Sequence, residues 1–344
     1  MKFYREHPVL FFCLLAAVGI GVVLMSLSLG QIDIPVGCVL SVIAEKAGLP
    51  FFNDTAVSAE QYAVLWYIRL PRVLVGLLVG AGLAASGTVM QGLFSNPLAD
   101  PGVIGVSSGA ALGAVLAISF GASETNMFMV PLFAFAGAMG AVLLTVSLAM
   151  RQGKLPIMTL LLSGVVVGML LGALTSGCLT VLSSQKVQQY LFWTIGGLDY
   201  RRWEHVFIGA VPILLCIIIM VMLSRHLNIL ALGEIEAKAV GMPVQKYRML
   251  LLVIAAMTTA TGVCISGNIG FVGLVVPHMM RFITGPDHRI LLPVSVVAGG
   301  IFLIFCDTAG RIIFSPAEVR VGVMTAILGT PYFLYLLRHS GQLK

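Results

Sequence analysis

Long apolar runs separated by short polar connections fill almost the whole chain. A helix that crosses a bilayer needs roughly 20 mostly apolar residues, and dividing the chain at glycine, proline and charged clusters yields runs of about this length. These runs are 8–30, 62–90, 103–120, 127–150, 155–179, 204–224, 246–265, 269–284, 290–309 and 321–338. The pattern predicts an all-α, polytopic membrane protein with about ten transmembrane helices in one domain over residues 1–344.

Composition agrees with a membrane protein and excludes other classes. Of the 344 residues, 59% are hydrophobic and only 10% are charged, whereas charged residues make up about 25% of a typical soluble domain. No room remains for an attached soluble catalytic domain. The run from Pro8 to Leu29 is too long for the apolar region of a signal peptide and lacks an A-x-A cleavage site, so we expect a retained first helix.

Basic residues predict the orientation, because Lys and Arg collect in the cytoplasmic loops of membrane proteins. With a cytoplasmic N-terminus, the inner segments contain Lys2, Arg5, Arg151, Lys154, Arg225, Lys238, Lys246, Arg248, Arg289, Arg338 and Lys344. We therefore expect both termini in the cytoplasm. The net charge of +6 reflects this topology rather than a basic stripe and does not indicate a nucleic-acid partner. Four arginines at outer helix ends oppose the rule and require a local explanation: Arg69, Arg72, Arg311 and Arg320.

Two predicted helices are interrupted by glycine and proline at membrane depth. The interruptions are residues 96–102 and residues 267–270, the latter followed by Pro277. Irregular backbone is tolerated there only when it is buried in protein or lines a wet cavity, so a translocation path is expected. Glycines at 164, 168 and 172 would let helices approach closely. We favour packing within the chain over a subunit interface for this run.

The sequence contains no recognisable catalytic chemistry. Without a G-x-x-x-x-G-K-[ST] phosphate loop, the chain is not expected to hydrolyse nucleotide. Acidic residues lie near helix ends rather than at the bilayer midplane, which disfavours an ion-coupled secondary transporter. We find no C-x-x-C pair or H-E-x-x-H motif, and we interpret His278 as hydrogen-bonded at a helix end rather than as a metal or heme ligand. No catalytic residue, metal or cofactor is predicted.

Residues 229–242 have the pattern of a short helix that docks onto a partner protein. Leu232, Ile235, Ala239 and Val240 recur at helical spacing. Glu234 and Lys238 can pair at i and i+4, and Gly241 followed by Pro243 ends the helix. The alternative is a helix lying on lipid, which the acidic residues and the lack of aromatic side chains disfavour.

Several motifs in order resemble one family, from about residue 60 to the C-terminus. They are R-L-P-R at 69–72, GTVMQGLFSNPLADPG at 87–102, LALGE at 230–234, GFVGLVVPH at 270–278 and GTP at 329–331. Together they resemble the FecCD-type permease subunits of ABC importers for iron-siderophores, heme and cobalamin. The resemblance implies a homodimer in the bacterial inner (plasma) membrane, surrounded by lipid. It also implies two copies of a cytoplasmic ATPase subunit and an extracytoplasmic substrate-binding protein.

The resemblance also implies roles for individual residues. Arginines on the outer face would pair with glutamates of the binding protein: Arg69, Arg72 and Arg311. Coupling to the ATPase would use Leu232, Gly233, Glu234, Ala237 and Gly241. The inner end of the pathway would be closed by Asn96 and Leu98, with a second constriction at Pro156 and Ile157. Relatives place small hydroxyl residues at that second constriction, so its chemistry here differs.

Arg320 replaces a proline of the family pattern E-[LIV]-P-[IV]-G. We expect it either to pair with Glu318 or Asp307, or to face the mouth of the pathway and attract an anionic substrate. The overall prediction is a permease that moves an iron chelate, either a ferric siderophore or heme, inward. The alternative within the family is cobalamin, and the alternative from another class is an ion-coupled carrier.

Overall fold

The computed structural model describes residues 6–48, 57–313 and 316–339. Among these residues, helices long and apolar enough to cross a membrane are α2 (Pro8–Ser28), the continuous helix Ala59–Leu93, α8 (Met129–Ala149), α9 (Ile157–Thr180), α11 (Trp203–Met222), α14 (Val244–Ser266) and α16 (His288–Ile313). Shorter apolar helices are α6 (Val106–Ser119), α15 (Val272–Thr284) and α17 (Val321–His339), the last apolar over Val321–Leu334. Each predicted run overlaps one of these helices, and no β-strand occurs in the described ranges.

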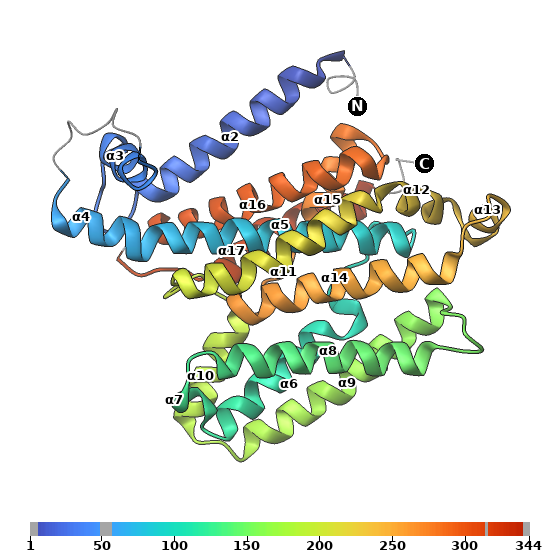
Figure 1. Cartoon of the computed structure of the whole chain (residues 1–344). Coiled ribbons are helices and arrows are strands. Elements are labelled where there is room, and N and C mark those ends of the chain that lie inside the picture. The colour runs from blue at the N-terminus through green and yellow to red at the C-terminus, as the bar shows by residue number, and fades with distance from the viewer. Residues whose placement is uncertain (1–5, 49–56, 314–315, 340–344) are drawn as a thin grey trace.

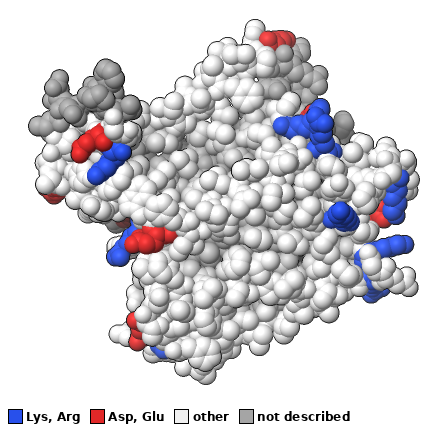
Figure 2. Space-filling view, viewed as in Figure 1, with Lys and Arg blue, Asp and Glu red and all other residues white. Residues whose placement is uncertain are grey.

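The long helices lie side by side, so the bundle has two distinct ends (Figure 1). One end, here called the α13 end, has α12 (Ser224–Leu232), α13 (Glu234–Ala239) and both marked chain ends. The opposite α10 end has α3 (Val36–Lys46), α7 (Ala122–Thr125) and α10 (Ser184–Ile195). Charged side chains gather at these two ends, with a broad uncharged band between them (Figure 2). This distribution is that of a membrane-spanning protein.

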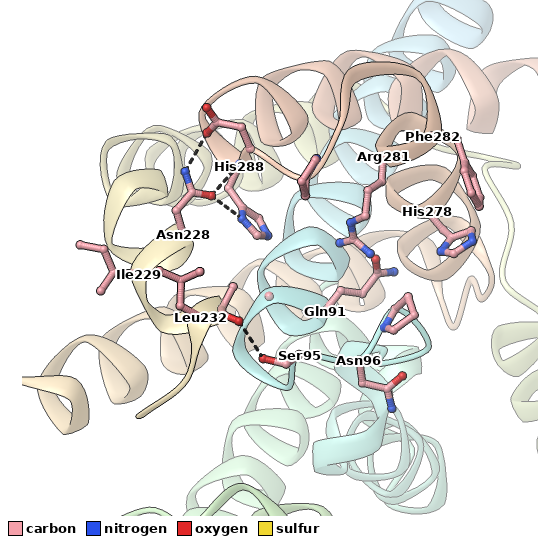
Figure 3. Close-up of a pocket in the computed structure, with 15 residues that line it drawn as sticks. Gln91, Ser95, Asn96, Asn228, Ile229, Leu232, His278, Arg281, Phe282 and His288 are labelled. Carbon is pink, nitrogen blue, oxygen red and sulfur yellow. Dashed lines mark hydrogen bonds between the residues drawn. The ribbon is translucent and has the colours of Figure 1, made fainter. Parts of the chain in front are cut away.

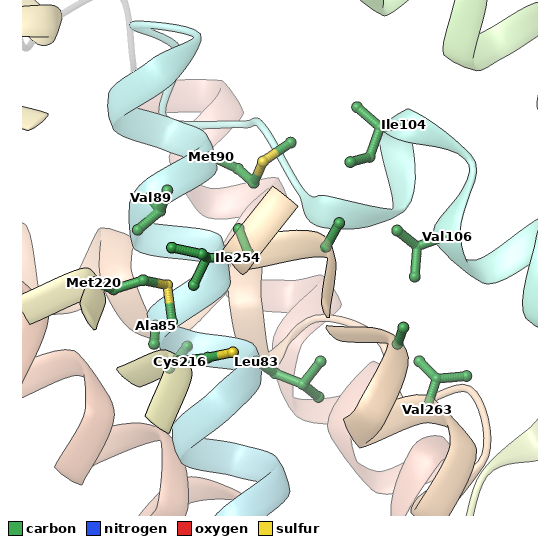
Figure 4. Packing of buried hydrophobic residues seen from close by; sticks show 14 of the residues in the cluster. Leu83, Ala85, Val89, Met90, Ile104, Val106, Cys216, Met220, Ile254 and Val263 are labelled. Atoms are coloured by element: carbon green, nitrogen blue, oxygen red, sulfur yellow. The ribbon is translucent and has the colours of Figure 1, made fainter. Parts of the chain in front are cut away.

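Helix α5 (Leu70–Leu93) is the centre of the main core. It packs against α16, α14, α11 and α15, and Val89 and Met90 are completely buried. Figure 4 shows these side chains among Ile254, Met220 and Ile104 from neighbouring segments. A helix that is apolar on all sides is expected to be buried in this way. α5 therefore holds the other helices in register from one end of the bundle to the other.

Glycine allows the closest contacts between these helices. A side chain at Gly87 would overlap the backbone carbonyl of Gly273, and one at Gly164 would overlap the carbonyl of Val103. Small residues permit such backbone contact. The favoured prediction for the glycine run, packing within the chain, is confirmed at Gly164, whereas Gly172 faces open space.

The two interrupted segments come together inside the protein. The first contains the 3-10 helix η3 (Pro101–Ile104). Asp100 caps its start, because the Asp100 carboxylate accepts a hydrogen bond from the Gly102 amide at 2.7 Å. The second separates α14 from α15 and contains Phe271 at φ 68°. Both segments border one small cavity of about 40 Å³ that also contacts Asn268 and Gly270. Ala99, Pro101 and Ile269 of these segments are buried, whereas Asn96, Leu98 and Gly270 are exposed, and the expected translocation path stays a prediction.

Helices α3 and α10 lie outside the predicted apolar runs. α3 packs Val39 and Val42 against Leu27 and Leu65 in a separate apolar cluster. α10 follows α9 directly and buries Tyr190 against α6. Both are too short to cross a bilayer, so a search for long apolar runs does not detect them.

Candidate functional site

A cluster of buried charges lies at the α10 end, centred on Arg72 of α5. Its guanidinium binds both carboxylate oxygens of Asp307, at 2.9 Å for Nε–Oδ2 and Nη2–Oδ1. It also contacts Glu318 at 2.9 Å and Asp199 at 3.1 Å. The side chains of Arg72 and Asp307 are 10% and 3% exposed. Arg72 therefore joins α5 to α16, to the segment before α17 and to the segment after α10.

Arg69 and Arg311 bind the end of α2. Nη1 of Arg69 donates to the carbonyls of Leu27 and Ser28 at 2.7 and 2.9 Å. Nη2 of Arg311 donates to the carbonyl of Ser26 at 2.9 Å, and its Nε lies 3.4 Å from Asp307. The last carbonyls of a helix lack partners within the helix, and the two arginines satisfy them.

The three arginines predicted to meet a binding protein are mostly buried within this chain. Arg69, Arg72 and Arg311 are only 5%, 8% and 6% exposed, and their hydrogen-bond acceptors belong to this chain. Arg69 and Arg72 face the same way because they are three residues apart where the π-helix η2 (Val64–Arg69) passes into α5. A role in docking stays a prediction.

Arg320 has neither of the partners expected for it. Its Nε lies 3.9 Å from Asp199, its guanidinium stacks 4.6 Å from the ring centre of Phe192, and it donates to the Phe192 carbonyl. The side chain is partly exposed and borders a cavity of about 350 Å³ beside Tyr200 and Arg201. Arg320 does pair with an acidic residue, but that residue is Asp199. The contacts with Asp199 and Phe192 join the residue before α17 to α10 and to the segment after it.

At the α13 end, the predicted coupling helix is two helices rather than one. α12 and α13 meet at Gly233, whose φ of 128° and ψ of 164° break the helix. Ala237 is buried, whereas Leu232 and Ile235 are 71% and 81% exposed. Gly241, at φ 76°, ends the segment before α14 begins. The predicted residues thus lie together, with apolar side chains directed outward.

Glu234 fastens this segment to the rest of the molecule. It accepts a hydrogen bond from Lys238 at 2.7 Å, the predicted i to i+4 pair, and from buried Arg248 at 3.1 Å. Arg248 also donates to the carbonyl of Leu155 at 3.0 Å. The hydrogen bond from Lys238 and then that from Arg248 hold the pKa of Glu234 below its usual range. The ion pairs are therefore complete above the ordinary carboxyl pKa and are lost only as pH falls through the lowered value.

A groove of about 830 Å³ lies beside the segment, between α12, the end of α5 and α15 (Figure 3). Asn96 lines it, and the Asn96 side chain accepts a hydrogen bond from the amide of Leu98 at 2.9 Å. Leu98 is exposed. Pro156 caps the start of α9 and Ile157 is its first residue, and neither lines the groove. The structure does not bring the two predicted constrictions together within one copy of the chain.

Hydrogen bonds between polar residues fix one wall of the groove. Asn228 donates to Asp287 at 2.7 Å and accepts from the backbone amide of His288 at 2.8 Å. The pKa of Asp287 lies well below its usual range because Arg289, and then Asn228, donate hydrogen bonds to it.

The expectation for His278 is wrong: neither ring nitrogen has a hydrogen-bond partner among the described residues. No signal in the sequence pointed to Asn228, Arg281 or His288, which reach the groove from separate segments.

Comparisons with known proteins agree with this architecture. The family model described as the FecCD transport family matches residues 15–339. The cobalamin import system permease protein BtuC of Halobacterium salinarum is 45% identical over 296 residues, covering 86% of this chain and 78% of that protein. The vitamin B12 import system permease protein BtuC of Salmonella typhimurium is 40% identical over 288 residues, covering 83% of this chain and 87% of that protein.

Solved structures share the fold. One, described as an inward-facing conformation of a metal-chelate type ABC transporter, has a TM-score of 0.84 and 32% sequence identity. The match covers 96% of this chain and 99% of that one. PsaBC from Streptococcus pneumoniae, in complex with Fab, has a TM-score of 0.56 at 18% identity, over 77% of this chain and 89% of that one. At that identity the likeness concerns the fold alone.

Proposed function

This chain belongs to the FecCD transport family, and on that premise we propose that it is the permease subunit through which cobalamin enters the cell. It is a multi-pass membrane protein of the ABC-importer permease type. One observation carries the choice of substrate: relatives at 45% and 40% identity, matched over 86% and 83% of this chain, are both cobalamin permeases. The sequence analysis favoured an iron chelate, and these relatives support its alternative instead.

Partners of three kinds follow from the proposal. The α13 end would face the cytoplasm, where two ATPase subunits supply the energy, and the α10 end would receive the binding protein. Exposed Leu232 and Ile235 offer an apolar contact to the ATPase. A second copy of the chain would complete the pathway, and the exposed apolar side chains of α9, including Met158, Leu162 and Met169, are available to that copy or to lipid.

Coupling between ATPase and permease would use the ion pairs of Glu234. A movement of α13 would be carried by Glu234 to Arg248 in α14, and by Arg248 to the Leu155 carbonyl just before α9. Transport by this route needs no covalent chemistry. At the other end, we propose that Arg69, Arg72 and Arg311 shape the surface that the binding protein meets, since they fix α2, α5 and α16 to one another.

Reconstituted transport would test the substrate. We expect the permease, its ATPase and its binding protein in liposomes to accumulate cobalamin in an ATP-dependent manner, and to leave heme and a ferric siderophore outside. The measurement is accumulation of each labelled ligand, with collapse of ion gradients by an ionophore as the control. Uptake of an iron chelate in preference to cobalamin would refute the substrate, and loss of uptake with the ionophore would favour an ion-coupled carrier.

Replacing Arg320 with proline should have a small effect. Its guanidinium is already held by Asp199 and by Phe192, and an exposed ion pair of this kind contributes about 0.5 kcal/mol. We expect cobalamin uptake by Arg320→Pro to fall about twofold, equally at low and high ionic strength. Uptake measured at two salt concentrations checks this. A large loss confined to low salt would assign Arg320 to attraction of an anionic substrate.

A further inference from the structure

Unpartnered polar atoms converge on the groove at the α13 end. Among the described residues, ten buried side-chain nitrogen and oxygen atoms lack a hydrogen-bond partner. Four of them belong to groove-lining side chains: Oε1 of Gln91, both ring nitrogens of His278 and Nε2 of His288. Buried polar atoms in native proteins almost always have partners. Their concentration around one groove makes it a candidate site for a polar partner.

Arg281 gives the groove an unmatched positive charge. Figure 3 shows its guanidinium directed toward the centre of the groove and toward Gln91. Arg281 is half-buried, and no ion pair or hydrogen bond joins it to another side chain in the described part of the chain. The acidic residue that lines the groove, Asp287, is already bound by Arg289 and Asn228. A carboxylate supplied from outside the chain would satisfy Arg281.

The apolar part of the lining lies beside the coupling segment. Ile229, Leu232 and Phe282 line the groove, and Leu232 and Phe282 are exposed. Leu232 ends α12, and Ile235 of α13, three residues further along the chain, is also exposed. A partner that covers α13 would therefore extend into the groove without a gap.

We propose that this groove is a second contact for the ATPase subunit. A segment of that subunit places a carboxylate beside Arg281 and an apolar side chain against Leu232 and Phe282. The inference rests on the proposed function, since it assigns the ATPase to the α13 end. The position of the groove beside exposed Leu232 and Ile235, which the proposed function assigns to the ATPase contact, favours the ATPase over the transported ligand.

Site-specific photo-cross-linking in the assembled complex would locate the partner. A photoreactive residue at Phe282 should cross-link to the ATPase, as should one at Ile235, whereas one at Tyr67, exposed at the α10 end, should not. If Ile235 cross-links and Phe282 does not, the groove is not an ATPase contact although the proposed function stands. If neither position reaches the ATPase, the proposed assembly itself fails.

Charge substitution tests the carboxylate. We expect Arg281→Gln to weaken binding of the purified ATPase subunit to the permease about tenfold, and Arg281→Glu more strongly, as for a charge pair shielded from water. Arg225→Gln removes an exposed arginine at the same end but outside the groove, and should change binding less than twofold. Equal losses of ATPase binding in both variants would show that the overall positive charge of this end, and not a specific pair at Arg281, causes the effect, and would contradict the proposal. Normal ATPase binding by Arg281→Gln, together with lost retention of labelled cobalamin, would make the groove a ligand site and overturn the proposal.

Discussion

Replacing Arg72 with glutamine should lower the free energy of unfolding by about 3–5 kcal/mol, because removing one member of a buried ion pair leaves the other charge unpaired. Asp307, which is 3% exposed, would lose its bidentate partner. Glu318 would lose its partner as well, and Asp199 would keep only its 3.9 Å contact with Arg320. The remaining contact of Asp307 with Arg311, at 3.4 Å, is too long to replace these bonds. Denaturant titration of the protein in lipid or detergent micelles measures the loss.

Arg289→Gln is the matched control for this prediction. Arg289 also pairs with an aspartate, Asp287, at 2.6 Å, but its side chain is 57% exposed. Water screens an exposed pair, which therefore adds little to stability, so this variant should remain close to the unmodified protein. Equal stability of the two variants would show that the Arg72 cluster does not hold α5, α16 and α17 together.

The long helices could be predicted from the sequence because the bilayer core contains no water that could bind exposed backbone N–H and C=O groups. Each apolar run must satisfy its own hydrogen bonds as a helix, so the runs and the observed helices coincide. α3 and α10 could not be found in this way, since neither crosses the membrane. The break at Gly233 was also missed, because apolar spacing alone continues through it while the glycine adopts a backbone angle closed to other residues.

Pairing across the fold could be predicted only in part. The i to i+4 pair of Glu234 and Lys238 follows from local spacing and is present. The arginines at the α10 end were identified as requiring a local reason, but Arg72 and Asp307 are 235 residues apart in the chain. Their contact depends on how α5 packs against α16, which hydropathy does not encode. The groove was not predicted for the same reason, since its lining comes from several separate segments.

The second large effect is expected at Gly233, between α12 and α13. Its φ of 128° and ψ of 164° belong to a region that is essentially restricted to glycine, and an added side chain would collide with the carboxylate of Glu236. Gly233→Trp should therefore displace α13 and break the Glu234–Arg248 contact. We expect uptake to fall more than about tenfold, equivalent to at least 1.4 kcal/mol of coupling, while the binding protein still docks at the α10 end.

Gly121→Trp separates coupling from general damage in this prediction. Gly121 also has a positive φ, 69°, but no neighbouring atoms would obstruct a side chain, and it lies next to α7 at the α10 end. This control should retain ATPase-driven uptake, and both variants should bind the binding protein. Full uptake by Gly233→Trp, with the ATPase copurifying at the normal level, would show that α12 and α13 do not transmit the ATPase movement. Gly233→Trp could also fail to accumulate in the membrane, and the Gly233→Ala variant distinguishes that failure from uncoupling. In Gly233→Ala the backbone strain remains but the bulk of the indole is absent. We therefore expect a folded protein with reduced uptake.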